Sequence, residues 1–154
     1  MYDALKVDFN SEHQLVVCRP HGIIDEYFAI QLLNFLLALE EVSEPFNRLL
    51  DLTFVTAILL GSGKIKEYAE ARSQATAHLA PFRTAVIAPG PETEAAARLY
   101  ATLVAGSKIH VNVFPNASSA AQWLNLPEQV LRSPALLPPR VEALNTLPQR
   151  PEAT

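Results

Sequence analysis

The residues best placed to do chemistry lie in the segment DLTFVTAILLGSGK, residues 51–64, where two glycines and a lysine follow an apolar run. A phosphate-binding loop needs a glycine, four spacer residues and then Gly-Lys-Ser/Thr, so that backbone amides surround the phosphates and a hydroxyl reaches Mg²⁺. Here Ile58 occupies the position of the first glycine and Ile65 that of the hydroxyl residue. The pattern therefore argues against nucleotide binding. Gly61 and Gly63 are instead expected to allow a tight turn into a helix that begins near them.

Histidine and cysteine residues form no catalytic or metal-binding pattern along the chain. The four histidines are far apart, and none has a partner at the spacing of a metal site: His13, His21, His78 and His110. Cys18 lies in an apolar segment, where a buried thiol is the usual state, and a reactive thiolate would need a cation such as Arg19 or His21 beside it. We therefore expect no enzyme activity, no cofactor and no metal. An enzyme that uses Cys18 or His21 is the alternative.

Asp51 is the most notable acidic residue because it lies near the end of an apolar strand, RLLDLT. A carboxylate in such a position must find hydrogen-bond donors or it costs stability. No second carboxylate lies at a spacing that would pair with it. We expect Asp51 to have a structural role, capping the loop that follows it.

Composition indicates one soluble globular domain. With 154 residues, of which 49% are apolar and 18% charged, the chain can bury a single core. The formal charge of −4 comes without a basic block, which argues against nucleic acid as a partner. One cysteine and no secretion pattern at the N-terminus predict a cytoplasmic protein. The longest apolar stretch, residues 27–39, is shorter than the ~20 residues that span a bilayer, so no membrane span is expected.

Apolar periodicity predicts alternating strands and helices. Strands at 4–9 and 14–20 are joined by NSEH as a hairpin, and Asp25 can cap a helix over 26–42. The pattern then alternates: strand 48–53, helix 64–79, strand 82–88, helix 92–105, strand 108–114 and helix 117–125. Helices between strands form crossover connections, so the fold class is α/β with a mainly parallel sheet.

Two of these helices have informative surfaces. The helix at 26–42 is apolar nearly all round, which indicates either deep burial or a face shared with a partner or ligand. In the helix at 64–79, one stripe carries Ile65, Tyr68, Arg72, Ala75 and Leu79. This stripe is expected to lie on the sheet.

The composition changes after residue 125. Six of the twelve prolines lie at 127–151, yet large aliphatic residues continue. A merely solvated tail would carry fewer of them. We therefore divide the chain into a domain at 1–125 and a proline-rich extension at 126–154 that docks on its own subunit or a neighbouring one. A short helix is expected after Pro138 and Pro139.

Two segments carry a resemblance to a known family. VVCRPHGIID leads into the first helix and RLLDLTFVTAILLGSGKIKEYAEA into the second, and this arrangement resembles the SpoIIAA-like family, related to the STAS domain of anti-sigma-factor antagonists. The resemblance covers about residues 4–125. It implies a mixed sheet of four or five strands with helices mainly on one face, and no catalytic centre.

The resemblance implies two kinds of function. Small stand-alone SpoIIAA-like proteins have a fold that suits the binding of lipophilic molecules. If this protein binds such a molecule, or a regulatory protein partner, the resemblance places the binding site beside the loop at 59–63. The candidate binding residues are Leu59, Leu60, Gly61, Ser62, Gly63, Tyr68 and Tyr100. The alternative is a phospho-regulated antagonist switched at Ser62, although the acidic residue that precedes the phosphoacceptor in such proteins is missing here. Surplus apolar surface on the first helix also predicts a homodimer.

Overall fold

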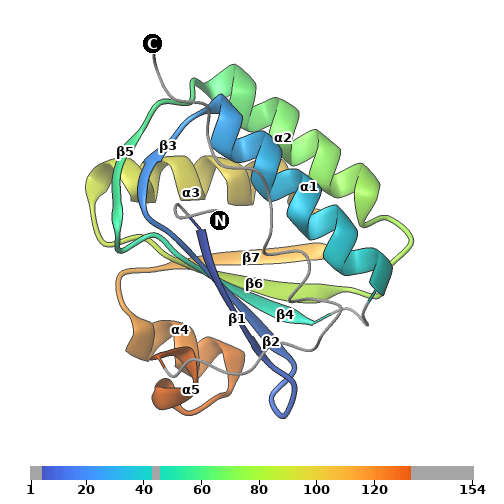
Figure 1. The fold of residues 1–154 in the computed structure, drawn as a ribbon, viewed down its shortest axis with the longest axis vertical. Coiled ribbons are helices and arrows are strands. Elements are labelled where there is room, and N and C mark those ends of the chain that lie inside the picture. Colours follow the sequence, from blue (N-terminus) through green and yellow to red (C-terminus); the bar gives the residue numbers. More distant parts are fainter. Residues whose placement is uncertain (1–4, 43–45, 133–154) are drawn as a thin grey trace.

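A five-stranded mixed sheet forms the centre of the protein, for which a computed structural model describes residues 5–42 and 46–132. The strand order is β1-β2-β4-β6-β7 (Figure 1). The strands are β1 (Leu5–Asn10), β2 (Leu15–Pro20), β4 (Asn47–Asp51), β6 (Phe82–Ile87) and β7 (Ile109–Phe114). β1 and β2 are antiparallel because a four-residue turn joins them, whereas β2, β4, β6 and β7 are mutually parallel because helices connect them.

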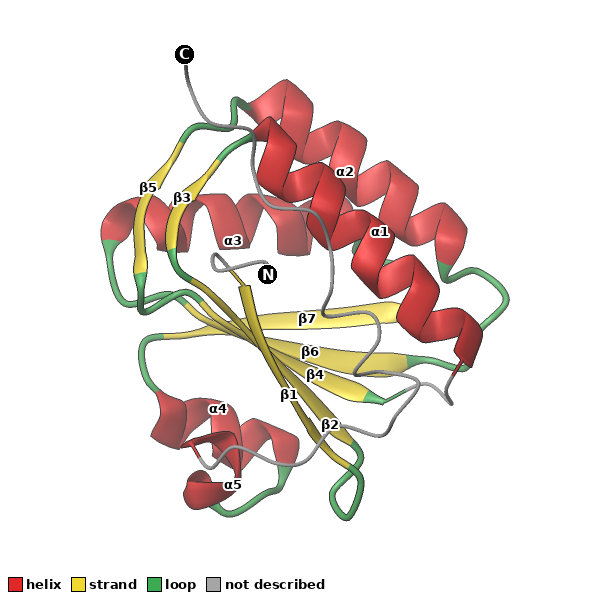
Figure 2. Ribbon diagram, viewed as in Figure 1, coloured by secondary structure: helices red, strands yellow, loops and turns green. Residues whose placement is uncertain are grey.

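Three helices cover one face of the sheet and two cover the other (Figures 1 and 2). The first face carries α1 (Glu26–Val42), α2 (Ser62–Ala75) and α3 (Pro91–Leu103), and the second carries α4 (Ala117–Leu124) and the short α5 (Glu128–Arg132). The alternation of side chains along β2 serves both layers. Val16 and Cys18 pack with α1, while Leu15 and Val17 pack with α4 and α5. The predicted α/β class and the mixed sheet are confirmed, and three of the five helices in the described residues lie on one face of the sheet.

The sequence pattern missed a second, two-stranded parallel sheet. It consists of β3 (Gly22–Ile24) and β5 (Val55–Ile58), which lie side by side beyond the ends of the main strands (Figure 1). The strand predicted at 48–53 therefore ends at Asp51, and the apolar residues after it begin a separate strand. β3 has only three residues, too few for alternation to show, and it begins at Gly22, whose φ of +86° favours glycine.

Most other element boundaries differ from the predicted ones by a few residues. The helix predicted over 64–79 runs over 62–75, and at its end Thr76 has a φ of −100° and donates its hydroxyl to the Arg72 carbonyl. Asp25 caps α1 as expected, with Oδ1 accepting from the amide of Phe28 at 2.9 Å. Residues 133–154, including the helix expected after Pro138 and Pro139, lie outside the described part of the chain.

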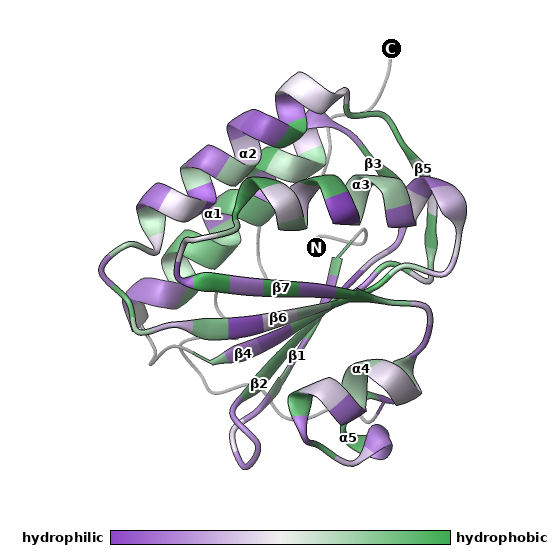
Figure 3. Cartoon of the chain, turned by 180° about the vertical axis from the view of Figure 1, so that it is seen from behind, coloured by the Kyte–Doolittle hydropathy of each residue, from purple (hydrophilic) through white to green (hydrophobic). Residues whose placement is uncertain are grey.

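α2 is the most hydrophilic of the three helices on its face, and polar residues mark much of its length (Figure 3). Its buried residues are Ile65, Ala69 and Arg72, at helical spacing along one stripe. This stripe therefore turns an arginine toward the interior of the protein. Arg72 is only 2% exposed.

Candidate ligand-binding cavity

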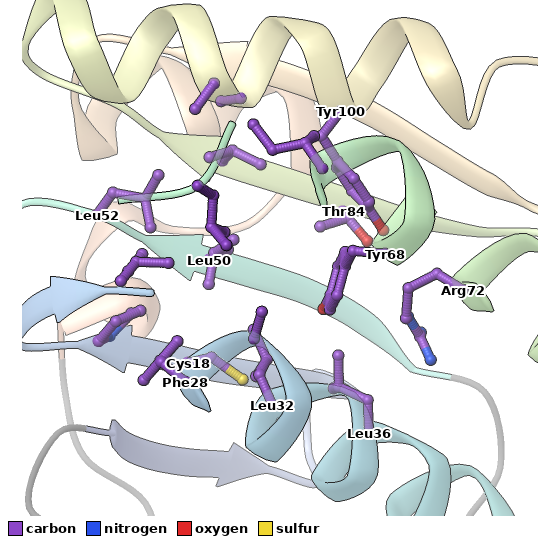
Figure 4. A pocket seen from close by; sticks show the side chains of 18 of the residues that line it. Cys18, Phe28, Leu32, Leu36, Leu50, Leu52, Tyr68, Arg72, Thr84 and Tyr100 are labelled. Carbon is purple, nitrogen blue, oxygen red and sulfur yellow. The ribbon is translucent and has the colours of Figure 1, made fainter. Parts of the chain in front are cut away.

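A cavity of about 140 Å³ lies between the sheet and helices α1, α2 and α3. β2, β4 and β6 form its floor, with side chains that include Cys18, Leu50, Thr84 and Val86. Figure 4 shows side chains from these strands and from the helices turned toward a common space. At about 30 Å³ per water molecule, the cavity would hold roughly five waters, more than the small voids usual in protein interiors.

Each wall of the cavity comes from a different element. α1 contributes Phe28, Ala29, Leu32 and Leu36, and α3 contributes Ala96, Ala97 and Tyr100. α2 contributes Ile65, Tyr68 and Arg72, whereas Ile24, Ile58 and Leu60 come from β3, β5 and the residues that follow β5. Apart from a few polar groups, the lining is aliphatic or aromatic. Such a space favours an apolar occupant.

One end of the cavity holds a buried cluster of charges, which we call the Arg48–Arg72–Glu40 cluster. Arg72 makes a bidentate contact with Glu40, with N–O distances of 2.9 and 2.7 Å, and Arg48 donates from Nη1 to the same carboxylate at 2.5 Å. The three side chains are between 2% and 6% exposed. In Figure 4, Arg72 lies at the opposite end of the cavity from Leu52.

Burial and mutual attraction act in opposite directions on the pKa values of this cluster. Desolvation alone would raise the pKa of Glu40, but the hydrogen bonds and charge of Arg72, together with those of Arg48, outweigh it and lower the pKa. Desolvation lowers the pKa of Arg48 despite the attraction of Glu40. For Arg72, the hydrogen bond to Glu40 and nearby groups overcome desolvation and raise the pKa. An arginine stays protonated in proteins, and the lowered pKa of Glu40 keeps its carboxylate ionised, so all three side chains carry their charges at neutral pH.

Tyr68 and Tyr100 stand between this cluster and the apolar part of the cavity. Their ring centroids are 5.6 Å apart and the rings are tilted by 51°. Burial raises the pKa of both phenols, so each remains a neutral hydroxyl that can donate a hydrogen bond. Both tyrosines were predicted from the sequence as cavity residues, and both line the cavity.

The remaining residues predicted for the site are placed differently. Leu60 lines the cavity, whereas Leu59 is 65% exposed and, like Gly61, Ser62 and Gly63, does not line it. The prediction that Gly61 and Gly63 adopt a tight backbone geometry is wrong. Gly61 has an ordinary φ of −72°, and a Cβ added at Gly61 or Gly63 would meet no atom within 4 Å. Gly61 caps α2 and Ser62 is its first, exposed residue.

The sequence analysis did not identify Glu40 or Arg48 as site residues. For each of them, the sequence contains one feature that indicates a buried ion pair. Glu40 lies near the C-terminus of α1, where the helix dipole disfavours an acid, so a nearby cation was to be expected. Arg48 lies inside the apolar strand β4, where a charged side chain needs a partner. Arg72 was visible on the apolar stripe of α2, but the stripe alone does not name its partner.

The carboxylate of Asp51 makes hydrogen bonds in the loop that follows β4. Its Oδ1 accepts hydrogen bonds from the amide and the hydroxyl of Thr53, in the loop that follows β4. Its Oδ2 lies 3.5 Å from Nε of Arg19, which also pairs with Asp8. Asp51 thus belongs to a separate ion-pair network, and it does not line the cavity.

The histidines are dispersed, as the sequence suggested. His13 lies in the hairpin turn, His110 is exposed on β7, and His21 stacks on Phe54 with centroids 4.8 Å apart. Within residues 5–42 and 46–132, no three His, Cys, Asp or Glu side chains are grouped so that they could hold a metal ion. In the same part of the chain, no helix combines the length and apolar character needed to cross a membrane.

Cys18 is buried in the floor of the cavity, and burial raises the pKa of its thiol to about 11. Nearby arginines, Arg48 first among them, only partly oppose this effect. A thiol with so high a pKa is almost entirely protonated at neutral pH, and the thiolate is the nucleophilic form. This environment does not favour a nucleophilic role for Cys18.

We expect the folded protein to lose stability between about pH 9 and pH 11. The Cys18 thiol ionises near its ordinary pKa of 9.0 in the unfolded protein and at a pKa of about 11 in the folded protein. The contribution of the neutral thiol to folding stability is therefore complete below pH 9 and is lost as the pH rises toward 11. The loss approaches ~3 kcal/mol, since one pKa unit corresponds to about 1.4 kcal/mol. Urea unfolding of wild type and Cys18→Ala across this range measures it. Identical alkaline losses in the two proteins would contradict the prediction, because Tyr68 and Tyr100 contribute equally to both.

Comparisons with known proteins identify the fold. No protein-family model matches the sequence, and no curated protein matches it. Among solved structures, the chain is similar to an uncharacterized protein of the DUF3478 family with a SpoIIAA-like fold, from Shewanella loihica PV-4. The TM-score is 0.52 and the identity 18%, over 79% of this chain and 92% of that one. Together with the strand order and helix layers, this match shows that the chain has the SpoIIAA-like fold.

Proposed function

We propose that this protein is a non-enzymatic binding module that takes a lipophilic small molecule into the cavity between its sheet and helices α1 to α3. The observation that carries the proposal is a cavity of about 140 Å³ whose lining is almost wholly apolar. The cavity is partly open at the protein surface, so an apolar ligand that enters it removes the apolar lining from water, which is favourable by about 25 cal/mol per Å².

The position of the cavity supports the proposal. It is built by elements far apart in the sequence, since β2, β4 and β6 form its floor and three helices form its walls. Side chains on rigid helices and strands hold a binding site more firmly than loop residues do. The loop at 59–63, where the sequence placed the site, supplies only Leu60.

Native mass spectrometry of the protein purified without detergent is the direct test. A discrete mass released on denaturation would support the proposal and give the chemical class of the ligand. A protein that carries no small molecule, and that takes up none from a panel of apolar compounds, would contradict it. The same spectra report whether the protein is a homodimer, which remains a prediction from the apolar surface of α1.

Filling the cavity is expected to abolish binding. Ala96 and Ala95 are neighbours on α3, but Ala96 lines the cavity whereas Ala95 is exposed. Ala96→Leu places extra methyl groups in the space and should weaken uptake of an apolar ligand by at least about tenfold, while raising the stability of the free protein. Ala95→Leu makes the same change on the outer face of α3 and should alter neither the uptake of the ligand nor the stability of the free protein. Equal binding by both variants would place the ligand elsewhere.

A phospho-regulated switch at Ser62 is the alternative function. One observation favours it: Gly61 rather than Ser62 caps α2, so the serine hydroxyl is exposed and is not needed to cap the helix. A phosphate at this helix N-terminus would be favoured by the helix dipole. The intact mass from the same experiment distinguishes the two proposals, because protein from its native host would carry a phosphate group rather than a lipophile.

A further inference from the structure

The Arg48–Arg72–Glu40 cluster contains one more positive charge than negative charge. Two guanidinium groups share the single carboxylate of Glu40, and among the described residues no other acid forms an ion pair with either arginine. Arg48 and Arg72 are 5% and 2% exposed, so water reaches the cluster poorly. An uncompensated buried charge is costly unless a partner of opposite sign reaches it.

Arg48 also has an unused hydrogen-bond donor. Its Nη1 donates to Glu40 and its guanidinium lies over the ring of Phe82, 4.3 Å from the centroid. Its Nε is buried and has no hydrogen-bond partner among the described residues. Arg48 lines the cavity, and an acceptor bound there would relieve the cost of this buried N–H group.

We propose that the ligand is a monoanionic lipophile, a medium-chain aliphatic carboxylate, with its carboxylate at Arg48 and Arg72 and its chain toward Leu52. This inference rests on the proposed function and names its class of ligand. One negative charge balances the single excess positive charge, whereas a doubly charged phosphate would exceed it. A guanidinium presents planar, paired donors that match the geometry of a carboxylate.

The dimensions and the tyrosines agree with this ligand. The volume is close to that of a cavity of roughly 150 Å³ that holds benzene, so it encloses most of a medium-length chain, and the open side of the cavity takes the remainder. The apolar side chains of Leu50, Leu52 and Phe28 lie away from Arg72, where a hydrocarbon chain would extend (Figure 4). Tyr68 and Tyr100, which stay neutral because burial raises the pKa of each, can donate further hydrogen bonds to a carboxylate.

The decisive comparison is between octanoate and 1-octanol, which have the same chain length and differ in charge. Isothermal titration calorimetry on the wild-type protein is expected to show octanoate binding at least about tenfold more tightly, since a charge-assisted hydrogen bond is the stronger kind. If 1-octanol binds as tightly as octanoate, the proposal that the ligand is an anion is wrong, while the proposed function of the cavity is still supported. If neither binds, the proposed ligand is wrong, and the panel of apolar compounds described above decides whether the proposed cavity function is wrong as well.

The variant Arg48→Met then tests whether Arg48 binds the carboxylate of the ligand. It leaves Arg72 and Glu40 as a neutral bidentate pair, and it should remove the preference for octanoate while 1-octanol still binds. Arg98→Met is the matched control, because Arg98 is exposed and pairs only with Glu94 among the described residues; it should keep the preference. Arg48→Gln, which also removes the charge but keeps a polar side chain, serves if the methionine variant does not fold, and it should likewise lose the preference, whereas Arg48→Lys, which retains the charge, should keep it. An unchanged preference in Arg48→Met would overturn the assignment.

Discussion

Glu40→Gln is expected to destabilise the fold by about 3–5 kcal/mol and to lower the Tm by roughly 10 °C. Glu40 is the shared partner of Arg48 and Arg72, at N–O distances of 2.5 to 2.9 Å, and its side chain is 4% exposed. An uncharged amide leaves two buried guanidinium groups close together without a counter-charge. Their repulsion and desolvation then act against folding. Urea and thermal unfolding measure the loss.

The control is Glu94→Gln, which breaks an exposed i, i+4 pair with Arg98 and should cost less than about 0.5 kcal/mol. The dependence on pH gives a second readout. Because the folded pKa of Glu40 is lowered, its contribution is complete above the ordinary value of 4.5 and is lost as pH falls toward the folded value. Glu40→Gln should lack this part of the acid destabilisation. Similar stability losses in the two variants would show that the buried cluster contributes little.

Phe28→Ala is expected to cost about 3–5 kcal/mol and to change which ligands fit. Phe28 is 1% exposed, belongs to the apolar cluster under α1 and lines the cavity. Removal of its ring joins new space to the existing cavity, so longer molecules should enter. Titration with straight-chain alcohols of increasing length measures this shift without involving charge. The best-bound alcohol should be longer for the variant than for the wild type.

Phe35→Ala is the matched control for this change. Phe35 lies on the same helix, is also 1% exposed and belongs to the same cluster, but it does not line the cavity. It should lose a similar amount of stability and keep the wild-type order of preference. If both variants shift toward longer alcohols, general loosening of the core explains the effect. If neither shifts, the ligand does not contact Phe28.

The sequence predicted the order of the main elements well because each has a strong local signal. β1 alternates apolar and polar residues, β2 begins with an apolar run, and α1 follows Asp25, whose side chain caps it. The two strands that were missed, β3 and β5, have three and four residues. Their pairing partner lies more than thirty residues away in the chain, and short segments stabilised by such distant pairing leave little local pattern.

The candidate site, like the fold, was predicted from the sequence only where the relevant residues are close together in the chain. Sequence by itself determined that Tyr68 and Arg72 share one face of α2, because helical periodicity fixes which residues lie together. It also determined that Cys18 lies in an apolar strand and that a phosphate-binding loop is absent from residues 51–64. Each of these conclusions depends on neighbours within a few residues.

Only the tertiary structure decided that Glu40, Arg48 and Arg72 meet. They come from the end of α1, the start of β4 and the last turn of α2, and the Glu40–Arg72 pair spans 32 residues. The crossover connections of the sheet bring these elements to one end of the cavity, and no local pattern encodes the convergence. The charge excess arises there because one buried carboxylate serves two arginines, a property of the packed arrangement and not of any single segment.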